Sequence, residues 1–252
     1  MNDGLTRTDD GEEEEGRAPS CVPPPRALPP LPQPSAGGTP LVFFVEGNIA
    51  SGKSTLVRLL GEAMPRSQVL LEPVDQWQAL HDGHGRNMLD YFYSDMRRHA
   101  YAFQSFAFFS RVAQLERIDP AAAVVFVERS VFSDRNVFAQ NCHARGTMSD
   151  IEWKLYNMWF DWVIQRSHAQ LHSARTVYLR SDPDTCAARL RRRARAEEGD
   201  VPLEYLRALH ERHEAWLMRC PADERPIVLD AATNFHTDPH CIRAMLSRLL
   251  PS

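Results

Sequence analysis

The feature that most constrains the fold of this chain is a glycine-containing segment between an apolar run and an amphipathic one. Residues 41–45 read Leu-Val-Phe-Phe-Val, and residues 47–54 read Gly-Asn-Ile-Ala-Ser-Gly-Lys-Ser. This spacing matches Gly-x-x-x-x-Gly-Lys-Ser/Thr, in which glycines let backbone amides curl around phosphate oxygens. Lys53 can reach the terminal phosphates, Ser54 can coordinate magnesium, and the following helix presents its N-terminal dipole. The sequence therefore predicts a phosphate-binding loop after the first strand.

The lysine of this loop is informative because lysine is rare in the chain. Of the 29 basic Lys and Arg residues, only Lys53 and Lys154 are lysines. Against such a preference for arginine, a lysine at this position favours the phosphate-binding interpretation over a glycine turn without function.

From residue 41 the chain alternates short apolar runs with long helical segments, which is typical of a parallel sheet flanked by helices. The expected strands are 41–45, 68–71, 123–127, 176–179 and 227–229. The expected helices are 54–63, 87–117 with a break, 149–165, 184–195, 203–218 and 238–249. We therefore expect an α/β fold with one doubly wound, five-stranded parallel sheet of the P-loop NTPase type.

Residues 1–40 differ in composition from the rest of the chain. They contain seven acids, three arginines and nine of the 18 prolines, so the whole net charge of -4 lies there. Such a segment cannot bury enough apolar surface to offset the entropy of ordering, and we expect a disordered tail before a single domain at 41–252. It has the features of neither a secretory signal nor a mitochondrial transit peptide, which favours a cytoplasmic or nuclear location.

Composition also disfavours several other classes of protein. No stretch approaches the roughly 20 apolar residues of a membrane-spanning helix, so we expect no membrane association. The balanced charge of 41–252 lacks the basic excess that nucleic-acid backbones require. The five cysteines form no Cys-x-x-Cys pair, and the histidine pairs do not follow His-Glu-x-x-His, which disfavours a disulfide framework or a dedicated metal cage.

Charged residues follow the second and third expected strands. Glu72 precedes Pro73, and residues 128–135 read Glu-Arg-Ser-Val-Phe-Ser-Asp-Arg. The carboxyl ends of parallel strands meet at the ligand crevice of such folds. Glu72 can abstract a proton from an attacking hydroxyl or simply cap a turn, and both interpretations stay open. Two acids and two arginines in one short segment favour phosphate and sugar chemistry.

Five segments together resemble the deoxyribonucleoside kinases, a family that includes deoxycytidine, deoxyguanosine and mitochondrial thymidine kinases. They are Gly-Asn-Ile-Ala-Ser-Gly-Lys-Ser-Thr at 47–55, Glu-Pro-Val-Asp-Gln-Trp at 72–77, Phe-Gln-Ser-Phe at 103–106, the 128–135 segment, and Pro-Leu-Glu-Tyr-Leu at 202–206. The resemblance covers residues 41–250 in the family's order. It implies ATP- and Mg²⁺-dependent phosphorylation of the 5′-hydroxyl of deoxyribonucleosides, for nucleotide salvage.

The resemblance implies roles for individual residues. Glu72 resembles the general base, Arg129 the arginine that bridges this carboxylate and the transferring phosphoryl, and Glu128 the acid that places the metal together with Ser54. The ATP phosphates would be held by the loop and by arginines that resemble the family's lid: Gly47, Asn48, Ile49, Ala50, Ser51, Gly52, Lys53, Ser54, Thr55, Arg189, Arg193 and Arg195. For Arg191 and Arg192 a solvated basic face or a nuclear-import patch is favoured.

The resemblance also implies a nucleoside pocket. Tyr93 and Glu198 match the pair that contacts the sugar 3′-hydroxyl. The base would be read by Gln104 and by Asp134, which Arg111 orients, while Trp77 can form a wall or belong to the core. Because Asp134 can accept from an exocyclic amino group, which thymine lacks, deoxycytidine and purine deoxynucleosides are favoured. A thymidine kinase and a broad-specificity kinase are the alternatives.

The helix expected at 149–165 has apolar residues on all sides, so one contact within a monomer cannot bury them all. It either lies at the centre of the monomer or packs against a second subunit, and the family's helical interface implies a homodimer.

Two other functions are weighed against the leading one. A nucleoside-monophosphate kinase is disfavoured by the Gln104, Arg111 and Asp134 set, and a non-catalytic scaffold is disfavoured by intact Lys53 and Glu72.

Overall fold

The computed structural model describes residues 39–166, 171, 174–199, 201–233, 235 and 239–250. Within this described part, five parallel strands form one sheet, as predicted. The strand order in this sheet is β2-β3-β1-β4-β5. The strands are β1 (Leu41–Glu46), β2 (Ser67–Leu70), β3 (Val124–Glu128), β4 (Arg175–Arg180) and β5 (Ile227–Asp230). Of the tail expected at 1–40, residues 1–38 lie outside the described residues.

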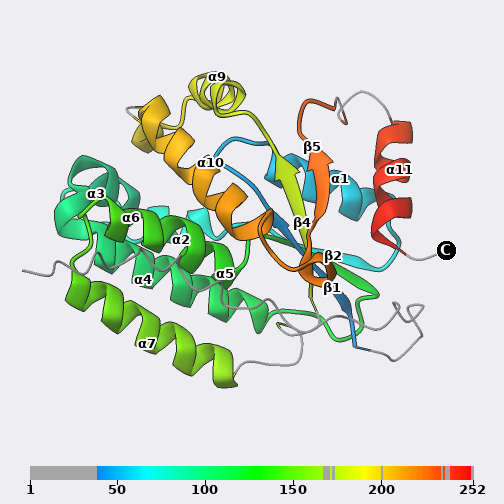
Figure 1. Cartoon of the computed structure of the whole chain (residues 1–252), viewed down its shortest axis with the longest axis horizontal. Helices are drawn as coiled ribbons and strands as arrows, with labels where there is room; N and C mark the ends of the chain where they lie inside the picture. Colours follow the sequence, from blue (N-terminus) through cyan, green and yellow to red (C-terminus); the bar gives the residue numbers. More distant parts are fainter. Residues whose placement is uncertain are drawn as a thin grey trace, which may run out of the picture.

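Helices cover both faces of the sheet (Figure 1). Alternate residues of β1 face opposite ways: Phe43 and Val45 pack with α1 (Lys53–Ala63) and α11 (Pro239–Leu249), whereas Val42 and Phe44 belong to the larger core on the other side. A strand buried on both faces is expected at the centre of a parallel sheet.

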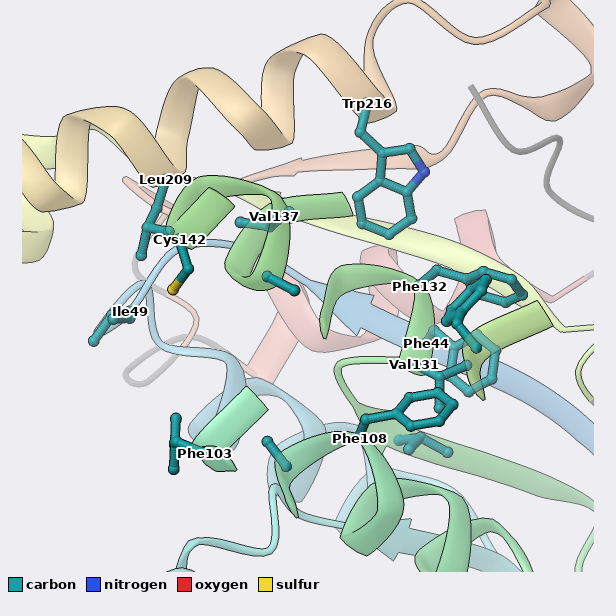
Figure 2. Close-up of a cluster of buried hydrophobic side chains, with 14 of the residues drawn as sticks. Phe44, Ile49, Phe103, Phe108, Val131, Phe132, Val137, Cys142, Leu209 and Trp216 are labelled. Atoms are coloured by element: carbon teal, nitrogen blue, oxygen red, sulfur yellow. The ribbon is translucent and has the colours of Figure 1, made fainter. Parts of the chain in front are cut away.

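The larger core is formed by α4 (Met96–Leu115), α7 (Asp150–Arg166), α10 (Leu203–Leu217) and the segment after β3. Figure 2 shows Leu209 and Trp216 pointing from α10 towards Val137, with Phe108 and Phe132 in the same cluster. This packing holds the segment after β3 against the sheet edge where the ligand crevice was predicted.

The long helix expected at 87–117 is two helices. α3 (Met88–Ser94) ends at Asp95, and the Asp95 side chain then accepts from the Arg98 amide as the N-cap of α4. Asn87 begins α3 with a capping box formed with Asp90. The break was predicted, and its cause is an aspartate that caps the second helix.

Several short elements were not predicted. They are α2 (Val74–Ala79), α5 (Val131–Ser133), the π-helix η1 (Asp134–Ala139), α6 (Gln140–Ala144), and the 3₁₀ helices η2 (Ala196–Glu198) and η3 (Ala222–Glu224). The remaining helix, α9 (Pro183–Arg193), follows β4. Single helical turns carry too little periodicity to be seen in a sequence, and π-helices often mark functional sites.

Candidate active site

One cavity of about 580 Å³ lies at the carboxyl ends of β1, β2 and β3. Most of the predicted site residues line it: Ile49, Ala50, Gly52, Lys53, Ser54, Thr55, Glu72, Trp77, Tyr93, Gln104, Glu128, Arg129, Asp134, Arg189, Arg193, Arg195 and Glu198. Gly47, Asn48, Ser51 and Arg111 do not line it and act from behind its wall. Residues from distant parts of the sequence therefore meet at the crevice that the topology predicts.

The loop after β1 depends on two glycines with positive φ. Gly47 has a φ of 148°, and a Cβ atom there would lie 2.6 Å from the Leu179 carbonyl oxygen of β4. Gly52 precedes α1 with a φ of 105°. The Asn48 side chain donates to the Leu206 carbonyl at 2.8 Å, which ties the loop to α10. Glycine is therefore required at Gly47 by close approach of the backbone.

The Lys53 amine is buried beneath this loop. Its Nζ atom donates to the Asn48 carbonyl at 2.7 Å. Burial and then the nearby charge of Arg129 lower the pKa of Lys53 to about 8. The amine is thus held ready for an anionic ligand and is easily deprotonated at alkaline pH.

Glu128, the last residue of β3, links the loop to the second strand. Its Oε1 atom accepts from the Ser54 hydroxyl at 2.7 Å, and its Oε2 atom accepts from the Glu72 amide at 3.3 Å. The Ser54 hydroxyl and the Glu128 carboxylate are hard oxygen donors side by side, a set that suits Mg²⁺. Among the described residues, no group of three or more His, Cys, Asp and Glu side chains forms a metal site.

The Glu72 carboxylate pairs with two arginines. Its Oε1 atom lies 3.0 Å from Nη2 of Arg111 and 3.0 Å from Nε of Arg129. Burial alone would raise the pKa of Glu72, but the charges of Arg129, Arg111 and Lys53 outweigh it and hold the pKa at about 2. The carboxylate is therefore ionised at neutral pH, and it lines the cavity.

Arg111 connects this carboxylate to Asp134. Its Nε atom donates to Asp134 Oδ2 at 2.8 Å, and its Nη1 atom donates to the Glu128 carbonyl at 3.0 Å. Arg111 is fully buried and is held entirely by these protein groups. Asp134 faces the cavity, and burial raises its pKa although Arg111 opposes this. Arg111 thus holds Asp134 from behind the cavity wall through this hydrogen bond.

Arg129 has a strained backbone with a φ of 66°. Its Nη1 atom donates to the Gly47 carbonyl at 2.7 Å, and its guanidinium lies 4.7 Å from the centre of the Phe138 ring. A non-glycine residue with positive φ persists only where its surroundings enforce it, and such strain is concentrated at functional sites. Arg129 touches both the phosphate-binding loop and Glu72.

The arginines of α9, and Arg195 just after it, reach the same cavity. Arg189 donates to the Ser51 carbonyl at 2.7 Å and to the Ala231 carbonyl at 2.9 Å. Arg193 and Arg195 both pair with Glu198, the latter at 2.9 Å. Arg192, which we expected on a solvated face, is exposed but also lines the cavity. That expectation is incomplete, because α9 ends beside the cavity and Arg192 lines it while remaining exposed.

The opposite wall comes from α2, α3 and α4. The Trp77 indole donates to the Ser110 hydroxyl at 2.9 Å and packs edge-on against Phe103, so this residue belongs to both the wall and the core. Leu89, Phe92 and Phe138 also line the cavity and were not predicted. Their apolar side chains look like ordinary core residues, and only the π-helix places Phe138 at the site.

A phosphate-binding loop on a parallel sheet, faced across one cavity by an ionised carboxylate and a row of arginines, defines the class of P-loop phosphotransferases. Within that class the match is specific, since the family model described as deoxynucleoside kinase covers residues 43–248. The chain belongs to the deoxynucleoside kinase family and is an enzyme that uses ATP to phosphorylate deoxynucleosides, as the sequence predicted. The alternatives of a nucleoside-monophosphate kinase and a scaffold are thereby set aside.

Curated relatives agree with this family. The chain is 39% identical to deoxycytidine kinase 2 of Gallus gallus, over 77% of this chain and 83% of the relative. It is 37% identical to human deoxycytidine kinase, over 79% and 83%. It is also 37% identical to mitochondrial thymidine kinase 2 of Macaca fascicularis, over 71% and 64%.

Proposed function

We propose that this kinase transfers the γ-phosphoryl group of ATP to the 5′-hydroxyl of deoxycytidine and of purine deoxynucleosides. The observation that carries this specificity is the Asp134 carboxylate at the cavity, held through its Oδ2 atom by Arg111. Its other oxygen can accept a hydrogen bond from the exocyclic amino group of cytosine or adenine, and the buried Gln104 amide offers a donor and an acceptor beside it.

The described geometry supports a role for Glu72 as general base. Its ionised carboxylate takes the proton of the 5′-hydroxyl, and the hydroxyl oxygen attacks the γ-phosphorus of ATP. The bond from this phosphorus to the β–γ bridging oxygen breaks, and ADP leaves. Arg129, which contacts both Glu72 and the loop, aligns the attacking and transferring groups. Lys53 and the lid arginines Arg189, Arg193 and Arg195 neutralise the charge that develops on the phosphates.

We further propose that Ser54 and Glu128 hold Mg²⁺ when ATP is bound. Their oxygens lie 2.7 Å apart and are the hard donors that this ion prefers. When bound, the ion would supply positive charge that neutralises the phosphates of ATP. Glu128 also accepts from the Glu72 amide, so the same carboxylate fixes the backbone that carries the base.

On the acceptor side, the Tyr93 hydroxyl and the Glu198 carboxylate are proposed to bind the sugar 3′-hydroxyl, and Trp77 to wall the base. A thymidine-preferring enzyme is the second candidate, because a thymidine kinase is among the relatives at 37% identity. Asp134 speaks against it, since thymine carries no amino group to donate to this carboxylate.

A homodimer is proposed from the exposed apolar side chains of α7. The buried residues of this helix are Tyr156, Phe160 and Val163, which lie on one side of it. Because one side alone is buried, the helix is not central to the monomer. The opposite side exposes large apolar groups together with Phe109 of α4: Ile151, Leu155, Met158, Trp159 and Trp162. A contiguous apolar surface of this kind marks an interface between proteins.

We also propose that residues 41–252 form one kinase domain that follows the tail, and that the protein acts in the cytoplasm or nucleus. In the described residues, no helix is both long enough and apolar enough to cross a membrane.

The direct test is a phosphate-transfer panel with radiolabelled ATP and the four natural deoxynucleosides. Deoxycytidine should be phosphorylated with the highest kcat/KM, followed by the purine deoxynucleosides, with thymidine last. Thymidine as the best acceptor would overturn the proposed specificity but not the family.

A further inference from the structure

A single carboxylate outside the cavity joins the two walls that enclose it. Glu197 lies in η2, and its Oε1 atom accepts hydrogen bonds from two side-chain amides. Gln78 Nε2 of α2 lies at 2.8 Å, and Asn87 Nδ2 at the start of α3 lies at 2.7 Å. Neither the site description nor the proposed mechanism uses this carboxylate, and it does not line the cavity.

The two amides belong to the helices of the nucleoside wall. Gln78 follows Trp77 by one residue, and Asn87 begins the helix that carries Tyr93. The Asn87 side chain makes two hydrogen bonds, because its Oδ1 atom accepts from the Asp90 amide as the N-cap of α3 while its Nδ2 atom donates to Glu197. The orientation of its amide is thereby fixed from both ends.

Glu197 is also joined, through its neighbour, to the wall that would hold ATP. Glu198 pairs with Arg193 and Arg195, which follow Arg189 on the same segment. Arg189 in turn donates to the Ser51 carbonyl of the phosphate-binding loop. The phosphate-binding loop is therefore connected to the nucleoside wall through Arg189, the end of α9 and the neighbouring residues Glu198 and Glu197.

We propose that Glu197 is a positioning residue that couples ATP binding to deoxynucleoside binding. When the arginines of 189–195 close on the donor phosphates, Glu197 moves with them and draws α2 and α3 onto the nucleoside. In return, a bound nucleoside orders the arginine segment through the same two amides, because coupling between two sites is reciprocal. This inference rests on the proposed roles of these arginines and of the Trp77 and Tyr93 wall.

The chain offers substitutions that separate coupling from folding. Asn87→Ser keeps an N-cap oxygen for Asp90 but removes the amide donor to Glu197. Asn87→Asp also keeps the cap and places a second carboxylate against Glu197. Glu197→Gln retains an acceptor oxygen, and the double change Asn87→Asp with Glu197→Gln restores the hydrogen bond with its direction reversed. Glu204→Gln, at an exposed position on α10, is the matched control for loss of a carboxylate.

The measurement is calorimetric titration of the full-length enzyme with a deoxynucleoside, in the absence and presence of a non-hydrolysable ATP analogue. The deoxynucleoside is the one that the phosphate-transfer panel ranks first. The ratio of the two dissociation constants is the coupling factor. KM values for both substrates, kcat and the temperature of unfolding are measured on the same variants.

We expect Asn87→Ser and Asn87→Asp to reduce the coupling factor about fivefold or more, within the usual range of such couplings. Nucleoside KM at saturating ATP should rise by a similar factor, while kcat and the unfolding temperature change little. Glu197→Gln should have a small effect, Glu204→Gln none, and the double variant should return to within about twofold of the wild type.

Three results would overturn the inference. If the coupling factor survives in both Asn87 variants, Glu197 does not transmit it. If the double variant is worse than either single variant, the direct hydrogen bond is not what matters. If the wild type shows no coupling, the proposed closure of the arginine segment fails as well, whereas activity in the phosphate-transfer panel would still support the proposed reaction.

Discussion

At the scale of single residues, Glu72 and Lys53 are two charged side chains whose pKa values are displaced. The pKa of Glu72 is held at about 2, so its carboxylate stays ionised throughout the pH range in which the enzyme can work. Its ion pairs stabilise the fold above the unfolded-state pKa near 4.5, and this contribution is lost as the pH falls towards 2. If activity falls as the pH drops just below neutral, the titration of another group must therefore cause that loss.

The lowered pKa of Lys53 predicts that activity falls at alkaline pH instead. Burial lowers its pKa to about 8, so the free enzyme loses this charge as the pH rises through 8. The kcat/KM for ATP, which reports the free enzyme, should fall about tenfold per pH unit above that value. Lys53→Arg should remove this decrease because a guanidinium stays protonated, whereas Lys154→Arg should keep it. A wild-type profile that is flat up to about pH 9.5 would contradict the assignment.

The proposed base choice depends on two residues, Asp134 and Arg111. Asp134→Ala combined with Arg111→Met removes the acceptor for an exocyclic amino group and leaves room for the 5-methyl group of thymine. Preference should shift towards thymidine by about tenfold or more in competition assays, a size typical of loss of a buried polar contact. Overall kcat should also fall, because Arg111 pairs with Glu72. An unchanged ranking of the four deoxynucleosides would refute this account of the pocket.

Between β1 and α1, the phosphate-binding turn tolerates no side chain at Gly47. Gly47→Ala would place a Cβ atom 2.6 Å from the Leu179 carbonyl at a φ of 148°, which strains the turn by on the order of 1–3 kcal/mol. We expect a lower unfolding temperature and a KM for ATP raised at least tenfold. Gly83→Ala, where nothing lies within 4 Å of the new atom, is the control and should behave as the wild type. Equal behaviour of the two variants would contradict the argument.

The elements show what a sequence can predict and what it cannot. All five strands were predicted within one residue at each end, because a buried parallel strand is a short apolar run with clear borders. The π-helix Asp134–Ala139 was missed, since no side-chain pattern distinguishes it from a loop. The φ of 66° at Arg129 was equally invisible, because tertiary contacts with Gly47 and Glu72 impose it.

For the site, the resemblance placed the polar residues, and the cavity brings most of them together. What it did not indicate is that Arg111 also pairs with Glu72, and that Arg192 lines the cavity. The link from Glu197 to Gln78 and Asn87 spans over 100 residues in sequence, and no local pattern announces it.

For the whole molecule, the exposed face of α7 predicts a dimer. Size-exclusion chromatography with light scattering should give about twice the 28.7 kDa of one chain. Replacing Met158 and Trp159 by Glu should yield monomers, because two charges would be buried in an apolar contact. Met218→Glu, at an exposed apolar position that ends α10, should leave the dimer intact. A wild-type mass of one chain would refute the prediction.

The central claim is that the Glu72 carboxylate removes the proton from the 5′-hydroxyl opposite the phosphate-binding loop. Glu72→Gln preserves the size of the side chain but removes the base, and Asp75→Asn makes the same change at an exposed carboxylate that also lines the cavity. Single-turnover phosphate transfer should slow by ~10² or more in the first variant, with nucleoside affinity within a few-fold, and stay near wild type in the second. An undiminished rate in Glu72→Gln would contradict the account.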